Sequence, residues 1–303
     1  MFQRVLVPLD GSRFAEVAVP AAVDLAKRAG GTVRFLLVHQ IRFNTVPPPE
    51  GAIITAEADA AIRDTERWYL AETVRPIEQA ATVSVSADVV NGQAGATLVQ
   101  AIGSWKADLV VMATHGRGPF SRFWLGSVAD YLIRHVTTPL LLLRPREETE
   151  TPALQVKTIM VPLDFSAASK AILEPVTLLA KLYGAQIELV HVVEPLLGET
   201  PAGFPYPLSP IAAIDERTRG LAADALGVIA ASVREKGPNV TTRVLFGSSA
   251  AGTLLERMNE VPPDMVALAT HGRGGFRRAV LGSVADKLIR GSHTTVLVMR
   301  PPI

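Results

Sequence analysis

Short apolar runs alternate with longer mixed segments along the first half of the chain. The mixed segments carry apolar residues at helical spacing, near 13–29, 57–80, 94–104 and 127–135. The short runs are apolar or β-branched and predict strands at 4–9, 32–39, 83–90, 108–113 and 139–144. Strands that alternate with helices and are apolar on both faces are typical of a parallel sheet covered on each side. We therefore expect an α/β fold with a doubly wound, five-stranded parallel sheet.

The second half of the chain repeats the first. Val5–Asp10 is matched by Ile159–Asp164, and Ala113–Arg134 is identical to Ala269–Arg290 at 17 of 22 positions. A repeat of this length is a whole domain rather than a solenoid unit. We therefore expect two tandem domains, 1–146 and 153–303, joined by the charged linker Pro145–Pro152. The second domain is expected to have strands near 158–163, 186–193, 240–246, 264–269 and 295–300.

Each copy has an irregular, proline-rich segment after its second strand. These segments are Arg42–Ile54, which contains three consecutive prolines, and Glu194–Ile211, which contains five prolines. Long loops of this kind commonly act as lids over a site or as contact surfaces. The sequence leaves both roles open.

Composition narrows the possible functions. The chain has no cysteine, which excludes disulfides, thiolate metal sites and a cysteine nucleophile. Its 30 basic and 29 acidic residues leave a net charge of +1, which argues against nucleic acid as a partner. No apolar run approaches the roughly 18 residues needed to cross a membrane, and no export leader is evident at Met1. We expect a cytoplasmic protein that binds neither nucleic acid nor membrane.

Candidate chemistry gathers at the ends of the first and fourth strands. Open α/β sheets bind ligands beyond the carboxyl ends of their strands, where the strand order reverses. With the order 3-2-1-4-5, Asp10 would lie across a crevice from Ala113 in the first copy. Asp164 and Ala269 would do the same in the second copy. We therefore expect one ligand site in each domain.

A glycine spacing is repeated in both copies. Nine residues separate Gly116 from Gly126-Ser127, and nine separate Gly272 from Gly282-Ser283. Glycines let backbone amides approach an anion, and the start of a helix adds unpaired N–H groups and a positive dipole end. Ser127–Asp130 and Ser283–Asp286 also spell a helix capping box, which needs no ligand. The repeated spacing favours a phosphate-binding loop.

Several charged residues near this loop have two possible roles. Asp10 and Asp164 could accept hydrogen bonds from ribose hydroxyls or hold a Mg²⁺ ion between phosphates. Each could instead cap the next helix. Arg117 and Arg273 could neutralise the charge of a phosphate group, or they could be solvated cations of a surface loop.

The histidines do not make a catalytic site. His115 and His271 lie beside the predicted loop, but no second catalytic group accompanies either, so we assign no catalytic residue. His39 and His191, in the second strands, are expected to pack or to form part of the wall of an adenine pocket.

The strand ending in Pro-Leu-Asp, the Thr-His-Gly-Arg-Gly run and the Gly-x9-Gly-Ser spacing together resemble the ATP-binding branch of the universal stress protein family. The resemblance covers nearly the whole chain, twice. It implies a Rossmann-like fold and ATP, with magnesium, as the ligand. The implied nucleotide contacts are Pro8, Asp10, Gln40, Gly116, Gly126, Ser127 and Val128, and Pro162, Asp164, Val192, Gly272, Gly282, Ser283 and Val284. Ala113 and Ala269 stand where the family pattern has its first glycine.

The resemblance also implies an arrangement of domains. Members of the family commonly dimerise, so Pro139–Arg144 and Thr295–Arg300 are candidates for an intramolecular contact between the two copies. A homodimer of the whole chain stays open. The two copies differ at positions expected to be equivalent: Gln40 in the first corresponds to Val192 in the second, and Pro119 corresponds to Gly275. These differences predict that the two sites bind the nucleotide with unequal affinity.

The leading hypothesis is a non-catalytic, ATP-binding stress-response or regulatory protein. A slow ATPase is one alternative, although the chain lacks a Gly-x4-Gly-Lys-Ser/Thr loop. A nucleotide-free interaction scaffold is the other alternative, and the two alanines are its best support.

Overall fold

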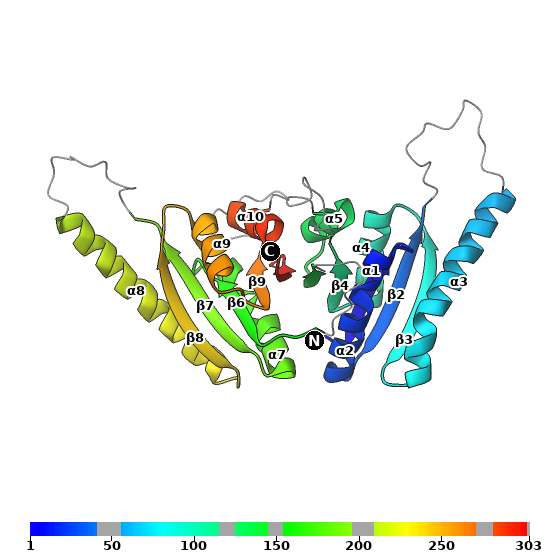
Figure 1. Ribbon diagram of the computed structural model, residues 1–303, viewed down its shortest axis with the longest axis horizontal. Helices are drawn as coiled ribbons and strands as arrows, with labels where there is room; N and C mark the ends of the chain where they lie inside the picture. The colour runs from blue at the N-terminus through cyan, green and yellow to red at the C-terminus, as the bar shows by residue number, and fades with distance from the viewer. Residues whose placement is uncertain (41–55, 115–124, 145–153, 196–208, 271–280, 302–303) are drawn as a thin grey trace, which may run out of the picture. The chain divides into compact units, whose positions relative to one another are not determined.

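The computed structural model describes residues 1–40, 56–114, 125–144, 154–195, 209–270 and 281–301. The chain divides into two compact units, with the boundary after Leu154 (Figure 1). Each unit is an α/β domain built on a parallel sheet.

The sheet of the first unit has five parallel strands in the order β3-β2-β1-β4-β5, which confirms the predicted order. The strands are β1 (Arg4–Leu9), β2 (Thr32–His39), β3 (Ser84–Asn91), β4 (Leu109–Ala113) and β5 (Leu140–Leu143). The helices are α1 (Arg13–Glu16), α2 (Ala18–Ala29), α3 (Ala56–Ala80), α4 (Ala94–Trp105) and α5 (Ser127–His135). Helix α2 packs against β1, β2 and β4, and α3 packs against β2 and β3.

The apolar pattern of the sequence explains these elements. Val5, Leu6 and Val7 are consecutive in β1 and fully buried, because side chains on both faces of the sheet are covered. Helix α2 buries residues at the spacing of one helical face, and it ends at Gly30, whose φ of 64° lies in the left-handed region. The predicted 13–29 helix is interrupted at Val17, which joins α1 to α2.

The second unit repeats this arrangement, with the strand order β8-β7-β6-β9-β10. The strands are β6 (Thr158–Pro162), β7 (Gln186–Val193), β8 (Asn239–Phe246), β9 (Met265–Ala269) and β10 (Thr295–Met299). The helices are α6 (Ala167–Lys170), α7 (Leu173–Tyr183), α8 (Ser209–Arg234), α9 (Ala250–Glu260) and α10 (Ser283–Gly291). The bounds of these five strands lie within one residue of the predicted ones.

In the described part of the chain, no helix is both long and apolar enough to cross a bilayer.

Candidate functional site

In each unit the central strand separates from one of its neighbours near its carboxyl end. β1 pairs with β2 along its whole length, to Leu9, but its ladder with β4 joins Val5 to Leu109 and Leu6 to Val110. Pro8 follows, and proline has no N–H to donate to a ladder. In the second unit the β6–β9 ladder likewise ends at Met160, two residues before the equivalent proline, Pro162. The proposed crevice would lie between the ends of these strands, where the strand order reverses.

The two aspartates at this crevice orient a serine. Oδ1 of Asp10 accepts hydrogen bonds from the Ser12 amide at 3.0 Å and from the Ser12 hydroxyl at 2.6 Å. Oδ1 of Asp164 accepts the same pair from Ser166, at 2.9 and 2.6 Å. The serines are the N-caps of α1 and α6, since their hydroxyl oxygens accept from backbone amides three residues on. Each aspartate therefore supports a cap rather than forming one.

Helix α5 begins without a side-chain cap. Its N-cap is Gly126, which has no side chain to accept a hydrogen bond, and Ser127 is already the first helical residue. The Asp130 carboxylate pairs with Arg134 one turn later, at 2.8 and 3.0 Å. The capping box that the sequence suggested is therefore absent from α5, because the helix starts one residue earlier than the motif requires, at Ser127 instead of Val128.

Helix α10 begins in the same way. Its N-cap is Gly282, again without a side-chain hydrogen bond, and Asp286 pairs with Arg290 at 2.7 Å. The Gly282 amide donates to the carbonyl of Thr270 at 2.8 Å. That bond holds the start of α10 beside the end of β9. The dipole and the first amides of α10 therefore lie at the carboxyl end of the sheet, where an anion would be stabilised.

The alanines that replace the family's first glycine are the last residues of β4 and β9. Ala113 and Ala269 are half-buried, and neither has a positive φ. The backbone at these positions therefore does not require glycine. The next residues, Thr114 and Thr270, are buried, and their amides donate to Leu143 and Met299 at 3.0 and 2.9 Å.

Part of the predicted site lies outside the described residues. This holds for the first glycine-loop residues of both copies, His115, Gly116, Arg117, His271, Gly272 and Arg273, and for most of the proline-rich segments and the linker. Their expected roles stay predictions.

The predicted equivalence of Gln40 and Val192 is wrong. Val5 pairs with Val33, and Ile159 pairs with Ile187, so the second strands of the two copies are offset by 154 residues. Gln40 is therefore equivalent to Glu194, and Val192 to Val38. The Val-His step present in both strands suggested another alignment, but strand register is fixed by backbone pairing rather than by one shared dipeptide.

The histidines of the second strands are not equivalent either. The position of His39 is taken by Val193, as shown by the carbonyl oxygens of both residues, which accept from Gly92 and Gly247 at 3.2 and 3.3 Å. His191 lies two residues earlier in its strand, where its Nδ1 hydrogen-bonds the Leu163 carbonyl at 2.6 Å.

A buried charge cluster at the end of β2 was not found from the sequence. His39 is 6% exposed, and its Nδ1 and Nε2 lie 2.8 and 2.9 Å from carboxylate oxygens of Glu66 and Asp59 on α3. Asp59 also pairs with Arg63. Burial by itself lowers the pKa of His39, but the hydrogen bonds to the two carboxylates outweigh it and raise that pKa above its ordinary value. One feature of the sequence could have revealed this cluster: Asp59 and Glu66 are seven residues apart, which places both acids on the same face of a helix.

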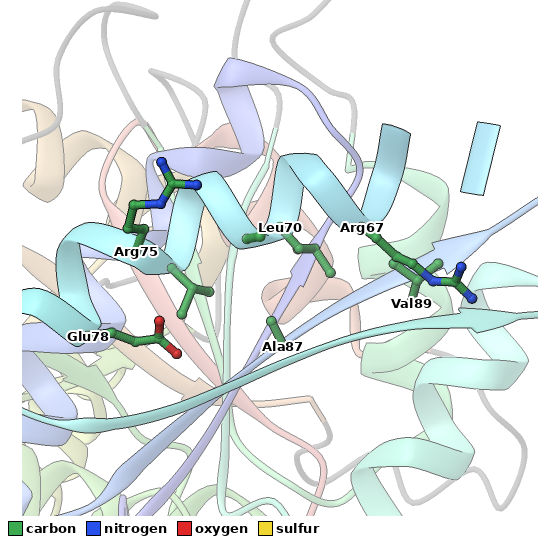
Figure 2. A pocket seen from close by; sticks show the side chains of 8 residues that line it. Arg67, Leu70, Arg75, Glu78, Ala87 and Val89 are labelled. Atoms are coloured by element: carbon green, nitrogen blue, oxygen red, sulfur yellow. The ribbon is translucent and has the colours of Figure 1, made fainter. Parts of the chain in front are cut away.

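A hollow of about 370 Å³ lies between α3 and β3 (Figure 2). Its apolar lining includes Leu70 and Val89, while Arg75 and Glu78 point in different directions from α3. The Arg75 guanidinium pairs with Glu72. Because these charged groups do not converge on one point, we do not place the ligand site here.

The described residues do not build a metal site from protein ligands alone. No group of three or more His, Asp or Glu side chains among them is arranged to hold an ion. A magnesium ion at Asp10 or Asp164 would therefore need oxygen ligands from another molecule.

Comparisons with known proteins agree with this fold. The model of the universal stress protein family matches residues 1–144 and 155–300. Universal stress proteins Rv2623 and Rv2005c of Mycobacterium tuberculosis are 27% and 25% identical to this chain, each aligned over 98% of it and 96% of the relative. The crystal structure of a universal stress protein from Archaeoglobus fulgidus superposes with a TM-score of 0.73 at 18% identity, covering 99% of both chains. The chain therefore belongs to the universal stress protein family and carries two tandem copies of its domain.

Proposed function

We propose that each copy binds one adenine nucleotide, ATP with magnesium, at the carboxyl ends of its central strands. The observation that carries this proposal is the start of α5 and α10. Both helices begin at a glycine without a side-chain cap, and the bond from Gly282 to Thr270 places α10 beside its strand end. A helix start whose N-cap residue offers no side-chain acceptor, together with a positive dipole end and no Cβ, suits a phosphate group.

Residues on both sides of the crevice have roles in this proposal. The amides of Ser127 and Val128, and of Ser283 and Val284, would hold phosphate oxygens together with the glycine loops. Asp10 and Asp164 would accept from ribose hydroxyls or reach a magnesium ion that the phosphates already hold. Pro8 and Pro162 would face the adenine beside the ends of the second strands.

We further propose a regulatory or stress-response role in the cytoplasm, with no catalytic step. This role is consistent with the described residues, because the serine hydroxyls that donate to Asp10 and Asp164 are committed to capping α1 and α6. Steady phosphate release that is lost on substitution of His115 and His271 would instead support a slow ATPase. Pairing of Pro139–Arg144 with Thr295–Arg300 stays a prediction.

The first test is denaturation of the purified full-length chain with and without Mg-ATP, with mass spectrometry of any small molecule released. A ligand at about 100 times its dissociation constant adds about 2.7 kcal/mol to the free energy of unfolding. A bound adenine nucleotide or a shift of this size supports the proposal. Neither signal would favour the nucleotide-free scaffold.

A further inference from the structure

Helix α8 covers the outer part of the second sheet with one face only. Ala222, Leu226, Ala230 and Val233 are buried, and the helix packs against β7 and β8 (Figure 1). These four positions follow the spacing of one helical face. The opposite face of α8 is open to solvent.

Three large apolar side chains project from that open face. Ile214, Leu221 and Val228 are 47%, 63% and 73% exposed, respectively, and follow one another at intervals of seven residues. An interval of seven places all three on one stripe along the helix. A stripe of exposed aliphatic residues on a soluble helix indicates a contact surface.

Small residues fill the gaps in this stripe. Thr218, Ala225 and Ser232 each follow one of the three large residues by four positions. The six positions together make the d and a positions of a heptad pattern, which we call the α8 seam. Large residues that alternate with small ones let two helices approach closely, each large side chain lying over a small one of the other helix.

The first unit lacks such a seam. The buried pair Leu70 and Val74 of α3 matches Leu226 and Ala230 of α8, an offset of 156 residues. By this offset Ala58, Thr65 and Glu72 take the places of Ile214, Leu221 and Val228. The seam is therefore not a consequence of the fold, which both units share.

Two charges beside the seam identify what covers it. Arg217 and Asp224 are exposed, lie seven residues apart on the same edge of the seam, and have no ion-pair partner among the described residues. In a two-fold symmetric, antiparallel helix pair, each edge of one helix lies beside the same edge of the other, and the two sequences run in opposite directions. Arg217 of one copy then lies opposite Asp224 of the other, and the symmetry makes this pair twice.

We infer that two copies of this chain associate through antiparallel pairing of their α8 seams. Leu221 then lies over Thr218 of the second copy, and Ile214 lies over Ala225, so four of the six seam positions make the contact in this register. Shifting the pairing by one heptad would bring Asp224 against Asp224 of the second copy, so charge selects the register. A single helix pair buries less than the roughly 800 Å² per partner of a standard interface, so the dimer is reversible.

The test is sedimentation velocity of the full-length protein over a wide concentration range. Leu221→Glu buries a carboxylate in the seam and is expected to raise the dimer dissociation constant at least about tenfold. Thr65→Glu, at the equivalent place on α3, is the matched control and leaves the constant unchanged. Circular dichroism of both variants checks that the fold is kept.

A charge exchange tests the register. Arg217→Asp and Asp224→Arg should each weaken the dimer, because each creates like charges across the pair, and the double variant should restore it. A chain that stays monomeric at every concentration overturns the inference. A dimer that is insensitive to Leu221→Glu, or a double variant that is not restored, also overturns it, because another surface or another register then makes the contact.

Discussion

The His39 imidazole lies between two carboxylates, and this arrangement depends on its charge. A neutral ring has one N–H and can donate to only one of its neighbours, Glu66 or Asp59. The protonated ring donates to both. The hydrogen bonds therefore favour the charged form and raise the pKa of His39, although burial opposes that change.

We expect the first unit to lose stability as the pH rises through the pKa of folded His39. Because that pKa lies above the unfolded value, the contribution is fully present below about pH 6.5 and disappears at higher pH. His39→Val, which copies Val193 of the second unit, should remove this dependence. Unfolding free energies from about pH 5 to pH 9 and an NMR titration of the ring check this prediction. A ring that titrates at or below its ordinary pKa contradicts it.

Two glycines of the first unit make a matched pair for stability. A Cβ on Gly31 would lie 2.5 Å from Cα of Gln3 and 2.6 Å from its carbonyl oxygen, both backbone atoms. Gly31→Ala should therefore destabilise the protein by about 1–3 kcal/mol. A Cβ on Gly103 in α4 meets no atom within 4 Å, so Gly103→Ala should stabilise by about 0.5–1 kcal/mol. Chemical denaturation of both variants measures the difference, and equal effects would show that Gly31 is not constrained.

At the scale of elements, the starts of α5 and α10 are the features on which the proposed phosphate binding depends. The serine of each Gly-Ser step is the first helical residue, so the cap position is taken by a glycine, which has no side chain to accept from the first amides. A helix start of this kind is less stable than one with an aspartate cap, and better suited to an anion. Stability and binding therefore make opposite demands on Gly126.

Gly126→Asp should separate these two demands. Its φ of −56° suits any residue, and an added Cβ would meet no atom within 4 Å. The new carboxylate would cap α5 and stabilise the protein by about 0.5 kcal/mol, while its charge would repel a phosphate there. Calorimetric titration should show ATP affinity at the first site reduced at least about tenfold, a loss of about 1.4 kcal/mol. Unchanged affinity would remove the start of α5 from the proposed site.

At the scale of the whole molecule, the two copies share a fold but differ around their crevices. Gln40 in one copy is replaced by Glu194 in the other, and the Glu194 carboxylate accepts from the Ala250 amide at 2.9 Å. In the proposed second site, this acidic side chain would add negative charge near the nucleotide. We propose domain bounds of 1–146 and 153–303 for these two copies.

The second site should bind ATP more weakly than the first. Asp10→Asn and Asp164→Asn each remove one crevice carboxylate, so titration of the two variants assigns each binding event to a copy. We expect the tighter event to be lost in Asp10→Asn and kept in Asp164→Asn. Two indistinguishable events in the unmodified protein would contradict unequal sites.

The sequence by itself determined the repeat and the bounds of most elements, while the expected strand order was confirmed only by the backbone pairing. Buried parallel strands and amphipathic helices have strong apolar periodicities, and the duplication showed each of them twice. Only the tertiary structure decided which residue caps α5, how the second strands align, and that His39 meets Asp59 and Glu66. These features depend on backbone pairing and on contacts between segments 20 or more residues apart, which local patterns do not encode.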